Sequence, residues 1–207
     1  MCGGGTTLVE CRLLGRHGIG VDVNPDAVMV TRDRLYFQPD DMFTSIAECP
    51  IDTYVGDARN LDAIASDSVD LVATHPPYAG IIAYSGRTIE GDLSSLKFDQ
   101  YVEGMREVAA ESLRVLKPGG HCAILIGDTR KHLHYVPISV RVLQAFLDAG
   151  FALREDIIKL QWKTKSTRER WGGKSYPFYK IAREHLFVFR KLGEGERRSE
   201  YKLSMKW

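Results

Sequence analysis

The sequence has few cysteines, no long apolar run and almost no net charge, and each absence excludes a class of protein. The four cysteines are far apart and form no Cys-x-x-Cys pair, so neither a zinc site nor a disulfide framework is indicated. No apolar run approaches the roughly 20 residues that a membrane span requires, and the first residues lack the basic-then-apolar pattern of a signal peptide. We therefore expect a cytosolic protein with free thiols and no membrane or metal partner.

The charge is unevenly distributed along the chain. With 207 residues, of which 44% are hydrophobic and 27% charged, the chain can form one substantial core, as ordinary globular proteins do. The formal net charge of +1 indicates no particular partner, but residues 159–183 hold eight basic residues and a single acid, Glu169. The remainder is therefore net acidic. This asymmetry predicts an anion-facing patch on an acidic protein.

Helical patterns alternate with short apolar segments, which predicts an α/β fold with a doubly wound, mostly parallel sheet. We expect helices at 6–16, 25 to about 36, 98–116 and 138–149, and strands at 17–22, 51–55, 69–73, 121–126, 153–160 and 185–190. Asn24 is the predicted N-cap of the second helix, and residues 118–120 (Pro-Gly-Gly) end the third. We expect one domain over 1–192, with a basic aromatic insertion at about 161–183, followed by a polar, exposed tail at 193–207.

Glycines and acids near the N-terminus form a pattern typical of nucleotide sites. Gly3, Gly4 and Gly5 precede Thr6 and a helix, so the backbone can turn sharply and approach a ligand. Asp22 ends the next strand about 20 residues further on, where such folds place an acid that binds ribose hydroxyls. Asp57, after the strand 51–55, could accept an adenine amino group. A structural turn, a helix cap or a turn aspartate would also explain these residues.

The tetrad His75-Pro76-Pro77-Tyr78 follows the apolar strand Val-Asp-Leu-Val-Ala directly. Ligands in open α/β sheets bind at the carboxyl ends of strands, and two prolines there restrict the backbone strongly. The Pro76 carbonyl would be a rigid hydrogen-bond acceptor, and Tyr78 offers a flat ring on which a base can stack. The tetrad therefore predicts a site for a planar ligand that carries a hydrogen-bond donor.

In this order and spacing, the motifs resemble a known family. The chain is similar, over about residues 2 to 190, to the DNA amino-methyltransferases that use S-adenosylmethionine and modify the 4-amino group of cytosine or the 6-amino group of adenine. The resemblance is carried by the segments CGGGTTLVE, GRHGIGVDVNP, GDARNLD, THPPY and VLKPGGHCAILIGD. The resemblance implies a Rossmann-like methyltransferase fold. It implies further that Gly3, Gly5 and Thr6 lie against the methionine part of the cofactor, that Asp22 binds its ribose and Asp57 its adenine amine, and that residues 75–78 hold the target base.

The first position of the tetrad departs from that family, which usually has Asp, Asn or Ser there. A neutral imidazole at His75 can accept a hydrogen bond from the reacting amine, whereas a protonated one cannot. Activity should then fall at acidic pH. In the alternative, Thr74 supplies the acceptor and His75 only supports the site. The implied reaction is an in-line methyl transfer to a base that has been flipped out of the duplex, and it requires no metal.

Two segments are candidates for binding nucleic acid. The basic segment interleaves aromatic residues, which is typical of phosphate contact combined with stacking, although a solvated loop with its aromatics packed on the core would have the same composition. The loop 79–97 with Arg87 is the second candidate. His132 and His134 have no carboxylate or cysteine nearby, so we expect a plain loop there rather than a metal pair. The predicted contact residues of the basic segment are Lys163, Lys165, Arg168, Arg170, Trp171 and Lys174.

Two rival functions remain open at this point. A methyltransferase for a guanine amine in RNA would have a similar proline-rich tetrad and basic segment. A non-catalytic nucleic-acid-binding fragment is the second rival, because the family's glycine loop normally follows a strand, whereas Met1 lies inside the motif. That strand would be the central one, and its absence would leave two unpaired strand edges. We therefore expect Met1 to be an internal methionine of a longer protein or a misassigned start.

Overall fold

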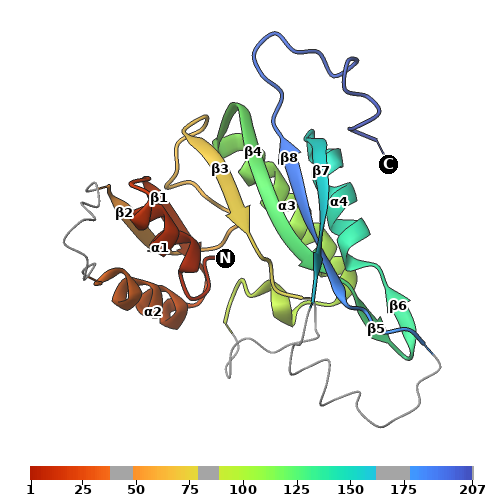
Figure 1. Ribbon diagram of the computed structural model, residues 1–207, viewed down its shortest axis with the longest axis horizontal. Coiled ribbons are helices and arrows are strands. Elements are labelled where there is room, and N and C mark those ends of the chain that lie inside the picture. Colours follow the sequence, from red (N-terminus) through yellow and green to blue (C-terminus); the bar gives the residue numbers. More distant parts are fainter. Residues whose placement is uncertain (38–48, 79–88, 162–177, 207) are drawn as a thin grey trace. The chain divides into compact units, whose positions relative to one another are not determined.

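The computed structural model describes residues 1–37, 49–78, 89–161 and 178–206, which form two compact units (Figure 1). The first unit consists of Met1–Ala65 and Ala73–Glu111, and the second of Ser66–Val72 and Ser112–Trp207. Across the described ranges, no helix is both long enough and apolar enough to cross a membrane.

The first unit contains a small parallel sheet. Strands β1 (Gly18–Asp22) and β2 (Ile51–Val55) pair from Gly18 opposite Ile51 to Asp22 opposite Val55. Helices α1 (Thr6–Leu13) and α2 (Pro25–Leu35) contact each other and both strands. The Asn24 side chain accepts a hydrogen bond of 3.0 Å from the Asp26 amide, so the predicted N-cap of α2 is confirmed. Because the strands are parallel, Asp22 and the turn after Val55 lie at the same edge of the sheet.

The rest of the first unit follows the strand β3 (Val69–Thr74). The short 3-10 helix η1 (Leu93–Ser95) leads into α3 (Phe98–Val115). Tyr101 and Met105 of α3 are fully buried. A Cβ atom at Gly104 would lie 2.6 Å from Leu93 Cδ2, so the absence of a side chain at Gly104 lets η1 pack closely against α3.

The second unit contains a mixed four-stranded sheet in the order β3, β4 (Leu116–Gly127), β8 (Arg183–Arg190) and β7 (Ala152–Leu160). Strand β8 is antiparallel to both β4 and β7. Helix α4 (Ile138–Ala149) packs on β4 and β8. Phe146 stacks on Phe189 with ring centroids 5.0 Å apart, and Phe151 contacts both rings. These buried aromatic side chains are the centre of the core of this unit.

The sheet topology agrees with part of the sequence prediction. The alternation of helices and strands is confirmed, and the bounds of β2 and α4 are those expected. In the described part of the chain, β1 pairs only with β2 and β3 only with β4. The Cys2 amide donates a hydrogen bond of 3.0 Å to the Val21 carbonyl, which places the glycine segment beside β1.

Two stretches of the chain differ from the prediction. Strand β4 begins at Leu116, so residues 118–120 belong to the strand rather than only ending α3. Gly119 adopts a positive φ of 80°, and the Gly119 amide and Gly120 carbonyl both bond to the backbone of Lys191. The plain loop expected around His132 is wrong, because β5 (Thr129–Lys131) and β6 (His134–Val136) form an antiparallel hairpin there.

The described part of the tail packs back onto the second unit. The Leu153 amide donates a hydrogen bond of 2.8 Å to the Ser204 carbonyl, and Met205 is buried, so the expectation of a fully exposed tail is wrong at these positions. Arg190 pairs with Glu196 at 2.8 Å, and its hydrogen bonds lower the pKa of Glu196 to about 2. The proposed division into 1–192 and 193–207 stays a prediction.

Candidate active site

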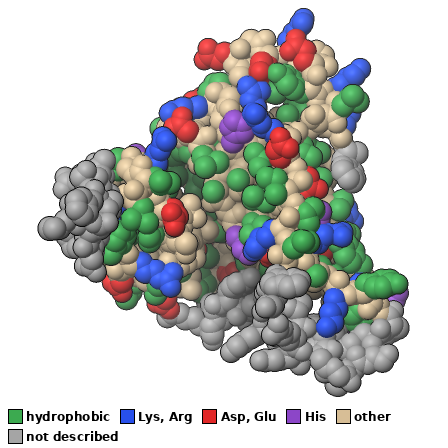
Figure 2. All heavy atoms as spheres, viewed as in Figure 1, with side chains coloured by type: hydrophobic (Ala, Val, Ile, Leu, Met, Phe, Trp, Pro, Cys, Tyr) green, Lys and Arg blue, Asp and Glu red, His purple; other side chains and the backbone are tan. Residues whose placement is uncertain are grey.

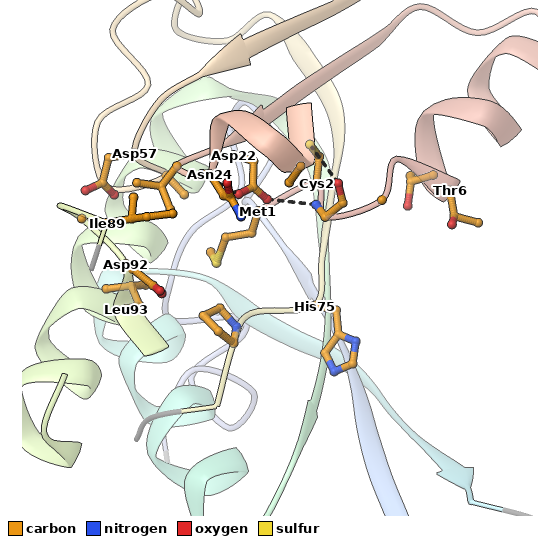
Figure 3. Close-up of a pocket in the computed structure, with 18 residues that line it drawn as sticks. Met1, Cys2, Thr6, Asp22, Asn24, Asp57, His75, Ile89, Asp92 and Leu93 are labelled. Atoms are coloured by element: carbon orange, nitrogen blue, oxygen red, sulfur yellow. Dashed lines mark hydrogen bonds between the residues drawn. The ribbon is translucent and has the colours of Figure 1, made fainter. Parts of the chain in front are cut away.

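A cavity of about 510 Å³ lies in the first unit and brings most of the predicted site residues together (Figure 3). The glycine segment, the carboxyl ends of β1 and β2, the chain after β3 and the turn before η1 line it. Of the predicted residues, Gly3, Thr6, Asp22, Asp57, His75 and Pro77 are on its wall. The cavity therefore unites residues that lie more than 70 positions apart in the sequence.

The two glycines of the loop that have positive φ differ in their surroundings. Gly5 (φ 75°) is buried and is the N-cap of α1, and a Cβ atom there would lie 2.5 Å from Thr31 Cγ2. Gly3 (φ 54°) lines the cavity, and a Cβ atom there would have no atom of a described residue within 4 Å. Gly5 is therefore required by packing, whereas the backbone of Gly3 faces open space that a ligand can fill.

Asp22 fixes the loop from the end of β1. Its Oδ2 accepts a hydrogen bond of 2.9 Å from the Gly3 amide, and its Oδ1 accepts one of 2.9 Å from the Asn24 amide. A carboxylate has about four acceptor sites, so both oxygens can accept a further hydrogen bond from the cavity. The side chain that caps α2 is Asn24, not Asp22. Figure 3 shows Asp22 beside Met1 at the centre of the site.

Asp57 is held by Arg59 in a geometry that the sequence did not reveal. The Arg59 amide donates to Asp57 Oδ1 at 2.9 Å, and Arg59 Nη2 donates to Oδ2 at 2.6 Å. Burial alone would raise the pKa of the Asp57 carboxyl, but the hydrogen bonds and charge of Arg59 hold it below its usual value. Arg59 also lies 3.7 Å from Glu107 of α3. Asp57 is therefore a charged acceptor in a fixed orientation.

The turn before η1 contributes a wall of the cavity that sequence reasoning missed. Ile89, Gly91, Asp92 and Leu93 line the cavity. Gly91 has a φ of 85°, and a Cβ atom there would lie 2.8 Å from Asp57 Oδ2, so only glycine allows this close approach. Asp92 caps η1 through a hydrogen bond of 2.8 Å from the Ser94 amide. The sequence Asp-Leu-Ser-Ser predicts such a cap, but nothing local in it predicts a contact with Asp57.

Thr74, the last residue of β3, and His75, the first residue of the tetrad, are the two candidate acceptor side chains. His75 is exposed and lines the cavity, and its Nε2 lies 3.3 Å from the Tyr78 hydroxyl, with the two rings edge to face. Pro76 is buried, and Pro77 lines the cavity. The Thr74 hydroxyl oxygen is buried and has no hydrogen-bond partner among the described residues. A buried hydroxyl without a partner is costly, so the Thr74 hydroxyl has hydrogen-bonding capacity that a ligand can use.

Arg87 and the predicted residues of the basic segment lie outside the described residues; the latter are Lys163, Lys165, Arg168, Arg170, Trp171 and Lys174. His132 and His134 lie on the β5–β6 hairpin, and the Nδ1 atom of His134 contacts the His132 carbonyl at 2.8 Å. In the described ranges, no three His, Cys, Asp or Glu side chains are grouped so that they could hold a metal ion.

Comparison with known proteins gives a family and a fold. A model of the DNA methylase family matches residues 69–205. The Type II methyltransferase M.MthZI of Methanothermobacter thermautotrophicus is 27% identical over 71% of this chain, which spans 46% of that protein. The release factor glutamine methyltransferase of Caulobacter vibrioides is 34% identical over 53% of this chain and 37% of its own length.

The fold comparison extends over nearly the whole chain. A crystal structure of a SAM-dependent methyltransferase from Methanosarcina mazei matches with a TM-score of 0.61 and 14% identity, covering 93% of this chain and 90% of that one. At this identity the match concerns the fold alone. It confirms the predicted Rossmann-like methyltransferase fold.

Proposed function

Because this chain belongs to the DNA methylase family, we propose that it transfers a methyl group from S-adenosylmethionine to an exocyclic amine of cytosine or adenine in DNA. The observation that carries the proposal is the cavity, where acids after two parallel strands meet the segment His75–Pro77. Ligands of open α/β sheets bind at this end of the strands. The chain spans 46% of the length of M.MthZI.

The residues present fit the proposed cofactor. S-adenosylmethionine, when bound, supplies an electrophilic methyl group on a sulfonium. Gly3 and Thr6 would lie against its methionine part, with Gly5 holding the turn against Thr31. Asp22 would accept hydrogen bonds from the ribose hydroxyls, and Asp57 one from the adenine amino group. The open space at Gly3 and the acceptor sites remaining on the Asp22 carboxylate support this assignment.

The tetrad would orient the target amine. The lone pair of this amine is delocalised into the base ring. Hydrogen-bond acceptors at the His75 Nε2 atom and the Pro76 carbonyl would therefore favour the pyramidal form of the nitrogen, which attacks the methyl group. The nitrogen gives up one proton when its new bond to carbon forms, and a neutral His75 can receive that proton. Tyr78 would stack on the base, which has to leave the duplex to reach the cavity. Most of the acceleration would come from positioning.

Two other substrates with a nucleophilic nitrogen are the alternatives to DNA. A guanine amine in RNA would suit a proline-rich tetrad as well, and the relative from Caulobacter vibrioides acts on glutamine. The family match over 69–205, which is described as a DNA methylase, favours DNA over both.

Labelled methyl transfer tests the proposal directly. The protein is incubated with S-adenosylmethionine that carries a tritiated methyl group, in parallel with duplex DNA, total RNA and a protein extract that contains release factors. We expect label in DNA only, and chromatography of the nucleosides then identifies N4-methylcytosine or N6-methyladenine. Asp22→Asn should lower cofactor affinity, whereas Lys202→Gln, a change at an exposed tail residue, should have no effect. Label in RNA or in protein alone would overturn the choice of DNA.

Matched variants separate the two acceptor side chains. If His75 is the acceptor, His75→Ala should reduce kcat about 100-fold or more without changing cofactor affinity measured by calorimetry. Thr74→Val keeps the shape of the side chain and removes the hydroxyl, which has no partner in the described part of the chain, so it should leave kcat within about threefold. The opposite pattern would assign the acceptor to Thr74.

A further inference from the structure

The β5–β6 hairpin of the second unit has an unusual tip. Lys131 pairs with His134, so the turn consists of His132 and Leu133 alone. Their φ values are 49° and 69°. Two-residue turns with positive φ at both positions strongly favour Asn-Gly or Gly-Gly, because other side chains are strained there. His132 and Leu133 are therefore residues that the turn itself does not favour.

Burial does not explain why these side chains are present. Leu133 is 58% exposed, and every residue from Lys131 to Tyr135 is exposed to solvent. A leucine at a strained and solvent-exposed position stabilises neither the turn nor a core. When packing does not compensate for backbone strain, the strain indicates a functional role for the side chain.

The base of the hairpin, in contrast, is tightly anchored. The Arg130 guanidinium lies 4.5 Å from the ring centroid of Phe178 and 5.8 Å from that of Tyr135, and it donates a hydrogen bond of 2.8 Å to the Tyr179 carbonyl. The Tyr135 hydroxyl donates to Asp128, whose carboxylate also accepts hydrogen bonds from the amide and hydroxyl of Ser139 at the start of α4. The exposed tip is thus held in place by a rigid base.

The surface around the hairpin is basic. Residues 128–136 and 178–183 contain four basic side chains and one acid, Asp128, and that acid is bound by Tyr135 and Ser139. Tyr179 is 92% exposed beside Arg130. Figure 2 shows basic, histidine and hydrophobic side chains gathered at the end of the second unit where Figure 1 places β5 and β6. The four basic residues are Arg130, Lys131, Lys180 and Arg183.

We propose that the β5–β6 hairpin is a β-ribbon that enters a groove of duplex DNA, with Leu133 in apolar contact with the bases and Lys131 on a phosphate. A two-stranded ribbon fits a DNA groove, and apolar side chains at such tips contact or separate bases. The positive charge and the exposed Tyr179 suit DNA, which is a polyanion with flat bases. An acidic protein is the alternative partner, but binding to its charged surface would not require a leucine at the tip of the hairpin. The inference rests on DNA being the substrate, as proposed above.

The test replaces the tip without disturbing the turn. The double variant His132→Asn/Leu133→Gly installs the sequence that this turn favours, so the thermal midpoint should stay equal or rise. Its affinity for a fluorescein-labelled duplex of mixed sequence, followed by anisotropy, should fall about tenfold if the tip contacts DNA. Lys131→Gln should lower the slope of log K against log salt by about one. Lys202→Gln, with the same charge change in the tail, should leave that slope unchanged.

The outcomes separate this inference from the proposed function. If the double variant and Lys131→Gln bind the duplex as tightly as the wild type, the hairpin inference is wrong, whatever the methyl-transfer assay shows. If the wild type does not bind duplex DNA at all, it is wrong as well. If the wild type binds DNA and the variants lose affinity while no methyl group is transferred, the hairpin inference holds and the proposed function fails.

Discussion

The two units use their strands for different purposes. Strands β1 and β2 of the first unit are short and partly exposed, and acids that line the cavity lie at or just after their carboxyl ends. Strands β4 and β8 of the second unit alternate buried and partly buried residues along most of their length and pack against α4 around an aromatic cluster. The small sheet therefore positions chemical groups with little core of its own, whereas the larger sheet holds the main apolar packing.

The largest expected effect is the loss of core packing in the second unit. Phe146 is fully buried among Phe151 and Phe189, so Phe146→Ala should lower the free energy of unfolding by about 3–5 kcal/mol. Val55 of β2 is 56% exposed, and Val55→Ala should cost less than about 1 kcal/mol. Denaturation in urea measures both values. Equal losses would contradict the contrast between the two sheets.

The glycine loop offers a sharper test within the first unit. Gly5→Ala places a side chain at positive φ and against Thr31, which should lower the free energy of unfolding by about 2–4 kcal/mol. Gly3→Ala has the same backbone strain but open space around it, so about 1–2 kcal/mol is expected. The same denaturation experiment compares the two. A Gly3 variant that is less stable than the Gly5 variant would show that packing against Thr31 is not the constraint.

The smallest expected effect concerns the orientation of Asp57. Arg59→Gln removes the charged hydrogen bonds to its carboxylate, so affinity for S-adenosylmethionine should fall about tenfold in calorimetry at neutral pH. Glu107→Gln changes the other, more distant partner of Arg59 and should leave affinity unchanged. Equal affinities of the wild type and the Arg59 variant would mean that Asp57 needs no positioning.

Cofactor affinity should depend on pH, and Arg59→Gln should shift that dependence in a defined direction. Arg59 holds the pKa of Asp57 below its usual value, so the carboxylate stays charged at moderately acidic pH. Cofactor affinity should be lost as the pH falls through that lowered pKa, and Arg59→Gln should move this loss to higher pH. S-inosylhomocysteine has a carbonyl in place of the adenine amino group, and it should discriminate less between wild type and variant than S-adenosylhomocysteine does. No shift in the pH profile would place the adenine elsewhere.

Much of the site was predictable because its signals are local. Asn24 followed by Pro25 marks the start of α2, and an acid after an apolar strand, such as Asp22 or Asp57, marks the end of a strand. Turns and caps depend on a few neighbouring residues, and parallel strands bring their carboxyl ends to one edge of a sheet. The sequence therefore indicated that Asp22, Asp57 and His75 would face a common site, and the cavity contains all three.

The tertiary structure alone decided which contacts the neighbouring segments make. The turn at Gly91 contacts Asp57 across a separation of more than 30 residues, and that contact depends on the packing of η1 against α3. Strand β4 continues through Pro118 and Gly119 because the chain at Lys191 bonds to it, although the same residues end a helix when read locally.

The β5–β6 hairpin is the clearest case of an element whose form depends on tertiary contacts. His132-Leu133 has none of the residues that favour a two-residue turn, so the local sequence predicts a loop. Arg130 between Phe178 and Tyr135, together with Asp128 at the start of α4, holds the hairpin through partners far along the chain. The sequence determined where six of the strands lie along the chain, the Asn24 cap of α2 and the acids at the strand ends, because these depend on neighbouring residues. The form of the hairpin and the orientation of Asp57 depend on side chains brought together only by folding.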